Sequence, residues 1–109
     1  MTQRYNTLKR DAYILNEIHR HKGIDNCISA ERLCRILEHK HMQVNKRSIN
    51  GIITKIKYAY GIPICYKRGK GYYYPQCTED LTYTIKDLRS MITALTKHVT
   101  FLESFYGIL

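Results

Sequence analysis

Residues 44–74 of this chain read VNKRSINGIITKIKYAYGIPICYKRGKGYYY, and this stretch decides the fold. Asn45 is a residue type that commonly caps the start of a helix, while Gly61 predicts its end and Pro63 prevents its continuation. The side chains at the helical spacing of a core face are Ile49, Ile52, Ile53 and Ile56. The apolar and aromatic runs Ile62–Tyr66 and Gly71–Tyr74 predict two strands around a basic turn. We therefore expect a helix followed by a hairpin.

The charge of this stretch is one-sided. No acidic residue occurs between Glu38 and Glu79, and the whole chain of 109 residues has a net charge of +9. Residues 1–75 contain fifteen Lys or Arg against five Asp or Glu, whereas residues 76–109 contain three against four. A charged surface kept for solubility is the alternative explanation, but a long acid-free segment favours a region that meets a polyanion.

Two further helices precede this stretch. Residues 6–21 predict a first helix whose apolar spacing is given by Leu8, Ala12, Leu15 and Ile18. Ser29 predicts the N-cap of a second helix, with Glu31 in its first turn. Its expected core residues are Leu33, Ile36 and Leu37. The order of three helices and a hairpin is that of a winged helix-turn-helix.

Residues 28–33 (ISAERL), 44–53 (VNKRSINGII) and the hairpin pattern Gly61-Ile-Pro-Ile followed by Gly-Lys-Gly-Tyr-Tyr resemble the winged-helix domains of biotin-repressor and DeoR-like bacterial regulators. The resemblance covers about residues 8–75, and its most specific part is the glycine, proline and tyrosine pattern of the hairpin. It implies a DNA-binding fold but no particular operator or effector.

The chain departs from these relatives at Gly51 and Ile52, where the family usually has a polar or basic residue and then an acidic one. Glycine inside a helix costs about 1 kcal/mol relative to alanine. Close approach of the backbone to DNA or to a neighbouring helix would explain Gly51, and so would simple tolerance of a small residue. Any base contact that the family makes from this position is lost here.

The third helix is expected to enter the major groove of double-stranded DNA, because its polar side chains lie opposite the isoleucines. Arg47 suits guanine and Asn50 suits adenine, so these two are the predicted base readers. Arg68 of the hairpin is expected to hold the DNA backbone, with entry into a minor groove at the wing tip as its alternative. The other candidates are assigned to phosphates or weaker contacts: Lys46, Ser48, Thr54 and Lys57 of this helix, Lys67 and Lys70 of the hairpin, and Ser29 and Arg32 of the second helix.

The last third of the chain carries a heptad repeat. Its a and d positions are Leu81, Ile85, Leu88, Ile92, Leu95, Val99 and Leu102. β-Branched residues at a and leucine at d favour a two-stranded coiled coil, although the flanking positions also allow a trimer, a tetramer or an antiparallel pair. An amphipathic helix packed on its own domain is the alternative, but a rod of about 42 Å is too long for a 77-residue domain to cover. The apolar end, residues 105–109, is interpreted as a cap on the coil or a docking point.

The predicted fold is therefore mainly α with a small β-hairpin: a winged helix-turn-helix at residues 1–77, followed by a long coiled-coil oligomerisation helix at residues 78–109. The absence of a signal peptide or membrane span predicts a cytoplasmic protein with reduced cysteines. Cys27, Cys34, His39 and His41 match no zinc spacing, so neither a metal nor a cofactor is expected. The chain also has no nucleophile motif, phosphate loop or paired carboxylates, so we do not expect an enzyme.

These features predict a small homodimer that binds a palindromic double-stranded DNA site, as a bacterial or phage transcriptional regulator does. The alternative is a winged-helix adaptor, such as a phage-encoded inhibitor or accessory protein, that binds a protein or nucleoprotein complex. RNA binding is a third reading, but the aromatic sheet signatures of common RNA modules are missing.

Overall fold

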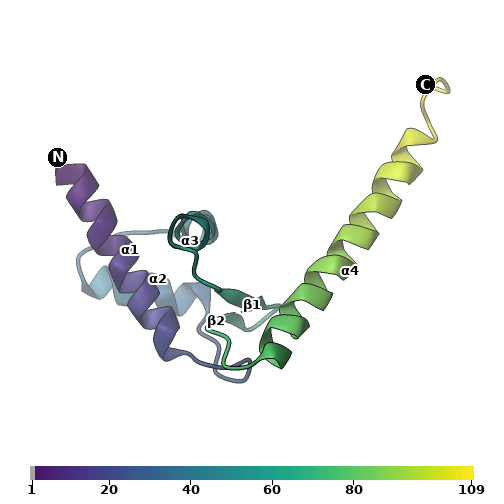
Figure 1. The fold of residues 1–109 in the computed structure, drawn as a ribbon. Helices are drawn as coiled ribbons and strands as arrows, with labels where there is room; N and C mark the ends of the chain where they lie inside the picture. The colour runs from purple at the N-terminus through teal and green to yellow at the C-terminus, as the bar shows by residue number, and fades with distance from the viewer. Residues whose placement is uncertain (1) are drawn as a thin grey trace.

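The computed structural model describes the backbone of residues 2–109 and the side chains of residues 7–109. Its elements, in chain order, are α1 (Thr2–Arg20), α2 (Ala30–His39), α3 (Lys46–Tyr60), β1 (Cys65–Lys67), β2 (Gly71–Tyr73) and α4 (Thr78–Glu103). The first three helices and the hairpin form a compact unit, and α4 projects from it as a separate rod (Figure 1). This confirms the predicted mainly helical fold with one small hairpin and a long C-terminal helix.

The buried face of α1 differs from the predicted one. Ile14 and Ile18 are the side chains that enter the core, whereas Leu8 is 53% exposed and Ala12 is exposed. The beginning of α1 extends beyond the rest of the domain (Figure 1). Of the four residues that gave the predicted helical spacing, Ile18 is buried and Leu15 is partly buried, because helical spacing alone does not say how much of a helix the domain covers.

Both predicted helix caps are confirmed. The Ser29 side chain accepts a hydrogen bond from the Arg32 backbone N–H at 3.1 Å, and Asn45 accepts one from Ser48 at 2.9 Å. Each cap satisfies a backbone donor that has no partner within its helix. Gly61 ends α3 in the left-handed conformation, with φ of 63°. The starts of α2 and α3 and the end of α3 thus follow from local chemistry.

The isoleucine face of α3 meets α1 and α2 in one core. Ile49, Ile53 and Ile56 are buried in a cluster with residues of α1, α2 and the hairpin, and Ile52 is partly buried at its edge. The core therefore holds one side of α3 in place and leaves the other side to solvent.

The hairpin is shorter than predicted and has a third partner. Pro63 cannot donate a backbone hydrogen bond, so strand pairing begins at Cys65 instead of at residue 62. Tyr72 of β2 exchanges two backbone hydrogen bonds of 2.8 Å with Ile28, which precedes α2. Gly71 makes this approach feasible, since a Cβ atom there would lie 2.1 Å from the carbonyl oxygen of Ile28. The chain before α2 thereby fixes the hairpin beside the helices.

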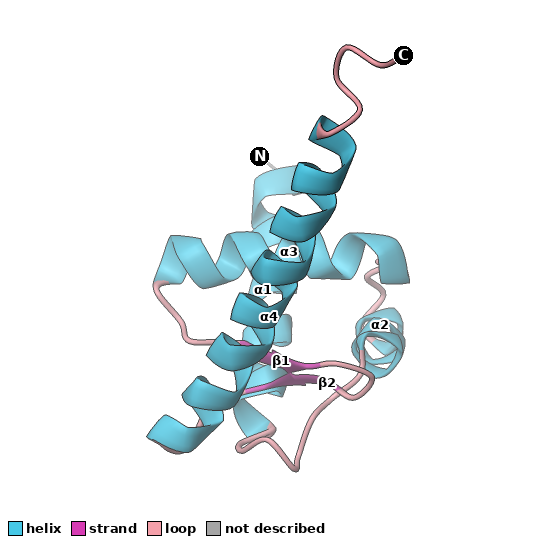
Figure 2. Ribbon diagram, turned by 90° about the vertical axis from the view of Figure 1, so that its right-hand side faces the viewer, coloured by secondary structure: helices cyan, strands magenta, loops and turns pink. Residues whose placement is uncertain are grey.

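Only the beginning of α4 is attached to the domain. The Tyr73 hydroxyl donates to the carbonyl oxygen of Asp80 at 2.7 Å, and α4 packs against β1. The Asp80 carboxylate, in turn, accepts from the Gln76 backbone N–H at 2.9 Å and orders the start of the helix. The contacts continue along α4 to Thr84 and Asp87, which bind Tyr73 and Arg68 of the hairpin. Figure 2 shows α4 in front of the hairpin, with its far end extending past the domain. None of the helices among residues 2–109 is long and apolar enough to cross a membrane.

Candidate nucleic-acid interface

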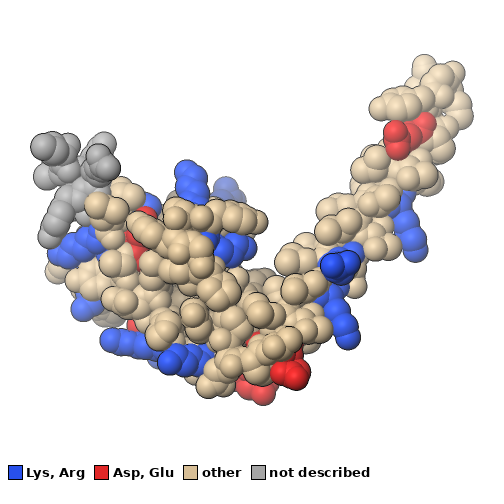
Figure 3. All heavy atoms as spheres, in the orientation of Figure 1, with Lys and Arg blue, Asp and Glu red and all other residues tan. Residues whose placement is uncertain are grey.

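The outward face of α3 is polar and carries the predicted base readers. Arg47, Asn50 and Thr54 are exposed, and Lys57 is half-buried at the flank of the same face. Lys and Arg side chains lie on the upper side of the domain in Figure 3, where Figure 1 shows α3. Because the isoleucines hold the opposite side in the core, this face is presented on a rigid support.

Sequence reasoning missed two residues of this face. Tyr58 is 77% exposed and lies about one turn beyond Thr54, and Lys55, directly after Thr54, is exposed at the flank of the same face. The spacing that selected Arg47 and Thr54 continues to Tyr58, so the pattern contained the signal. The Lys57 ammonium lies 5.2 Å from the centre of the Tyr58 ring, a distance at which a cation is attracted to an aromatic face.

Gly51 lies at the middle of the exposed face of α3. A Cβ atom built there has no heavy atom of another residue within 4 Å, so no neighbouring helix of this chain requires the glycine. Close packing against a neighbouring helix of the described domain therefore does not explain Gly51. Close approach to a ligand and simple tolerance both stay open.

The segment that is acid-free in sequence is not acid-free in space. Lys46 donates to Glu31 of α2 at 2.8 Å, and this contact lowers the pKa of the Glu31 carboxyl. Lys67 of β1 lies 4.0 Å from Asp25 in the loop before α2. Such exposed pairs are weak and are screened by salt, so a phosphate can take either lysine from its partner.

Arg68, at the hairpin turn, is held by α4. Its Nη2 lies 2.6 Å from Oδ1 of Asp87 and its Nε lies 3.4 Å from Oδ2, so the guanidinium grips both carboxylate oxygens. This two-point geometry is the strongest form of an arginine–carboxylate contact. Arg68 is thus directed toward α4 in the single chain, and its contact with the DNA backbone or a minor groove stays a prediction. Lys70 of the same turn is exposed.

Asn50 is connected to the hairpin. The hydroxyl of Tyr72 donates to Asn50 Oδ1 at 2.8 Å, although the two residues are 22 positions apart. Thr54 uses its hydroxyl differently, since Oγ1 donates to the Asn50 backbone carbonyl at 2.9 Å, one turn earlier in α3. Asn50 therefore has a fixed side chain on a fixed backbone.

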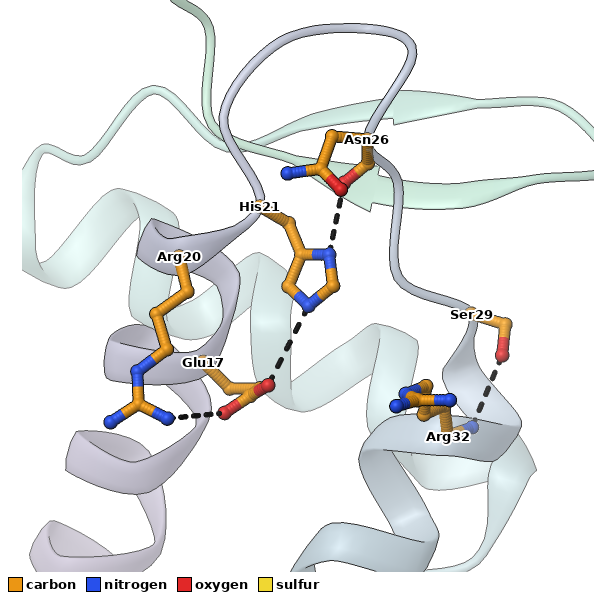
Figure 4. A network of polar contacts seen from close by, with 6 residues as sticks. All are labelled: Glu17, Arg20, His21, Asn26, Ser29 and Arg32. Carbon is orange, nitrogen blue, oxygen red and sulfur yellow. Dashed lines mark hydrogen bonds and ion pairs between the residues drawn. The ribbon is translucent and has the colours of Figure 1, made fainter.

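The start of α2 is supported by a polar network at the end of α1 (Figure 4). His21 contacts the backbone carbonyl of Asn26 at 2.9 Å and the Glu17 carboxylate at 3.5 Å, and Arg20 contacts the same carboxylate at 3.5 Å. These contacts fix the turn that leads to Ser29. The Ser29 oxygen accepts from the helix, so its own proton is available to a phosphate at the N-terminus of α2. Arg32 and Ser48 are exposed at the first turns of α2 and α3.

The cysteines and histidines are the candidate metal ligands of this chain. Cys27, Cys34, Cys65 and Cys77 are all free, and burial raises the thiol pKa of the first three. Within residues 7–109 no three His, Cys, Asp or Glu side chains are grouped closely enough to hold a metal ion. A raised pKa keeps a thiol protonated and unreactive at neutral pH.

Comparisons with protein-family models, with curated proteins and with solved structures found no match to this chain. Its function is therefore argued from the exposed face of α3, the hairpin and the α4 rod.

Proposed function

We propose that the chain is a homodimeric winged-helix protein that binds double-stranded DNA at a specific site and regulates transcription in a bacterium or phage. The observation that carries this proposal is the exposed polar face of α3, on which Arg47, Asn50 and Thr54 share one side while the opposite side is locked in the core. An α-helix with its side chains is about 10–12 Å wide and fits a major groove about 12 Å wide.

The residues of this face divide into two roles. Arg47 can donate two hydrogen bonds to the O6 and N7 atoms of guanine, and the Asn50 amide can pair with N6 and N7 of adenine. The lysines and Ser29 bind phosphates, which supplies affinity and register but little sequence preference. Lys55 and Tyr58 join the phosphate-binding group, since both are exposed, Tyr58 on the face of Thr54 and Lys55 at its flank.

The α4 rod supplies the dimer. The seven heptad side chains are between 37% and 61% exposed in the single chain, so the seam that the sequence predicts is not covered by its own domain. Those residues are Leu81, Ile85, Leu88, Ile92, Leu95, Val99 and Leu102. A second copy of α4 covers this seam with the same a and d pattern, and two α3 helices related by a twofold axis then read an inverted repeat.

Site selection from a random pool of DNA duplexes tests the proposal. The expected result is an enriched inverted repeat whose affinity falls steeply as salt rises, because phosphate binding releases counterions. An affinity that does not depend on salt contradicts DNA binding. Failure to enrich any sequence favours the adaptor alternative, in which the partner is a protein.

Arg47→Ala gives the matching mutational test. It removes a base contact, so we expect a loss of about 1–3 kcal/mol of binding free energy and relaxed preference at one base pair of each half-site. Lys97→Ala is the control, since it removes one exposed positive charge from the last third of α4. Equal losses in both variants would mean that Arg47 acts through charge alone.

A further inference from the structure

Tyr72 is one of the most constrained residues in the hairpin. Its backbone is bound to Ile28 through two hydrogen bonds of 2.8 Å, and its ring lies 4.9 Å from the ring of Tyr66. Only 4% of the residue is exposed. The neighbouring Gly71 lets the chain approach Ile28 so closely that no side chain fits there. The position of the Tyr72 ring is therefore set by backbone contacts and by the core, independently of any ligand.

The hydroxyl of this fixed ring reaches the exposed face of α3. It donates to Oδ1 of Asn50 at 2.8 Å. A tyrosine hydroxyl is protonated at neutral pH, and burial, which raises the pKa of Tyr72 to about 12, keeps it so. In the structure it is the Asn50 oxygen Oδ1, and not the amide nitrogen, that lies beside this hydroxyl.

The orientation of the amide matters because the two ends of asparagine have different partners on adenine. The oxygen accepts from the N6 amino group, and the nitrogen donates to N7. An amide that rotates freely presents either end, since this terminal torsion has broad, roughly twofold minima. An amide oxygen has two lone pairs, so Oδ1 can accept from Tyr72 and still accept from a base.

We propose that Tyr72 is a positioning residue for base recognition: its hydroxyl sets which end of the Asn50 amide meets the DNA base. The inference rests on the proposed function, because it assigns a further specificity-determining residue to the same surface. The hairpin then contributes to base recognition by α3 through Asn50, although Tyr72 itself is buried and does not touch the DNA.

A purely structural role predicts something different. If Asn50 only satisfies a buried hydroxyl, then removal of that hydroxyl changes folding stability and leaves base preference intact. If Tyr72 orients Asn50, its removal changes the preference at the base pair that Asn50 reads and leaves the other positions unaltered.

The experiment compares site selection by the wild-type protein and by the full-length variants Asn50→Ala, Tyr72→Phe and Tyr66→Phe. Asn50→Ala identifies the base pair that Asn50 reads. We expect Tyr72→Phe to lose about three- to tenfold of the preference at that same base pair, as one hydrogen bond is removed. Tyr66→Phe is the control, because it removes a hydroxyl from the facing ring of the same hairpin without a bond to Asn50. It should keep the wild-type preference.

Two results overturn the inference. One is an unchanged preference in Tyr72→Phe, and the other is an equal loss at every position of the site. In both cases the wild-type protein still selects a sequence, so the proposed function stands. A wild-type protein that selects no sequence refutes the proposed function, and the inference falls with it.

A measurement on the wild-type protein covers the case in which Tyr72→Phe does not fold. Nuclear magnetic resonance of the free protein should give through-space contacts between the Asn50 side-chain amide and the Tyr72 ring whose pattern fits a single orientation of the amide, with Oδ1 toward the hydroxyl. Absence of these contacts, or an amide that samples both orientations, overturns the inference.

Discussion

At the scale of single residues, the structure shows which glycine is required by the backbone and which could be replaced by a residue with a side chain. Gly51 and Gly71 are both in predicted functional elements, but their surroundings differ completely. Space is open around Gly51, whereas a Cβ atom at Gly71 would overlap the backbone of Ile28. The φ angle of Gly71 is 131°, which other residues rarely adopt. Gly71 is thus required by the join between the hairpin and the chain before α2.

Replacement of Gly71 by alanine should therefore destabilise the protein strongly. We expect Gly71→Ala to lower the free energy of unfolding by roughly 3 kcal/mol or more, because backbone strain adds to a clash that side-chain motion cannot relieve. Gly69→Ala is the matched control: its φ is 78°, but nothing lies within 4 Å of the added atom. Its cost should stay near 1 kcal/mol. Urea unfolding of both variants checks this, and equal costs would contradict the close approach.

At the element scale, α2 modulates the charge that α3 presents. Glu31, in the first turn of α2, lies 2.8 Å from Lys46 in the first turn of α3 and 3.9 Å from Arg35. Its carboxylate stabilises the N-terminus of its own helix and also neutralises part of the predicted phosphate-binding surface. The Glu31 carboxylate is therefore favourable for the stability of α2 but unfavourable for the predicted binding of DNA.

Glu31→Gln should release Lys46 for phosphate binding. We expect affinity for DNA to rise about two- to fivefold at low salt, with the gain shrinking as salt increases, since exposed charge pairs are screened. Glu38→Gln near the end of α2 is the control, because it removes an exposed carboxylate from the same helix. Binding titrations at several salt concentrations provide the measurement. A gain of the same size in both variants would indicate a general charge effect instead of a specific contact with Lys46.

At the scale of the whole molecule, the shape is dominated by α4. The radius of gyration is 17.2 Å and the longest extent is 54 Å. A compact domain of this length would have a radius of gyration of about 13 Å. The helix of 26 residues is about 39 Å long, and only its first turns contact the hairpin. An exposed apolar seam of this length is what the proposed dimer covers.

A charge placed in the seam should separate the subunits. The wild-type protein is expected to sediment at about twice 12.9 kDa, and Leu95→Glu at the mass of one chain. Leu95 is 61% exposed in the single chain, so this variant should still fold. Affinity for an inverted repeat should fall about 100-fold, because linkage of two half-sites is lost. Affinity for one half-site should not change.

Lys97→Glu is the control for the seam, since it places the same charge between two heptad layers but outside the a and d positions. It should leave the dimer intact. Analytical ultracentrifugation at micromolar concentration distinguishes the outcomes. A wild-type monomer, or a Leu95→Glu dimer, would contradict association through α4.

The helix starts at Ser29 and Asn45, the stop at Gly61 and the long C-terminal helix with its heptad pattern were all predictable from the sequence. These features depend on contacts between residues within about four positions of each other, or on a repeat, so local chemistry is sufficient to predict them. Arg47 and Asn50 were selected on the same basis, and the structure places both on the exposed face of α3. Their contacts with DNA stay a prediction.

The contacts between residues far apart in the sequence could be found only in the folded structure. Glu31 lies beside Lys46, Asp87 beside Arg68, and Tyr72 beside Asn50, across separations of 15, 19 and 22 residues. The burial of Ile14 in place of Leu8 was decided in the same way, by where α1 leaves the domain. Contacts over such separations arise from the path of the chain in space, and no periodicity or spacing encodes them.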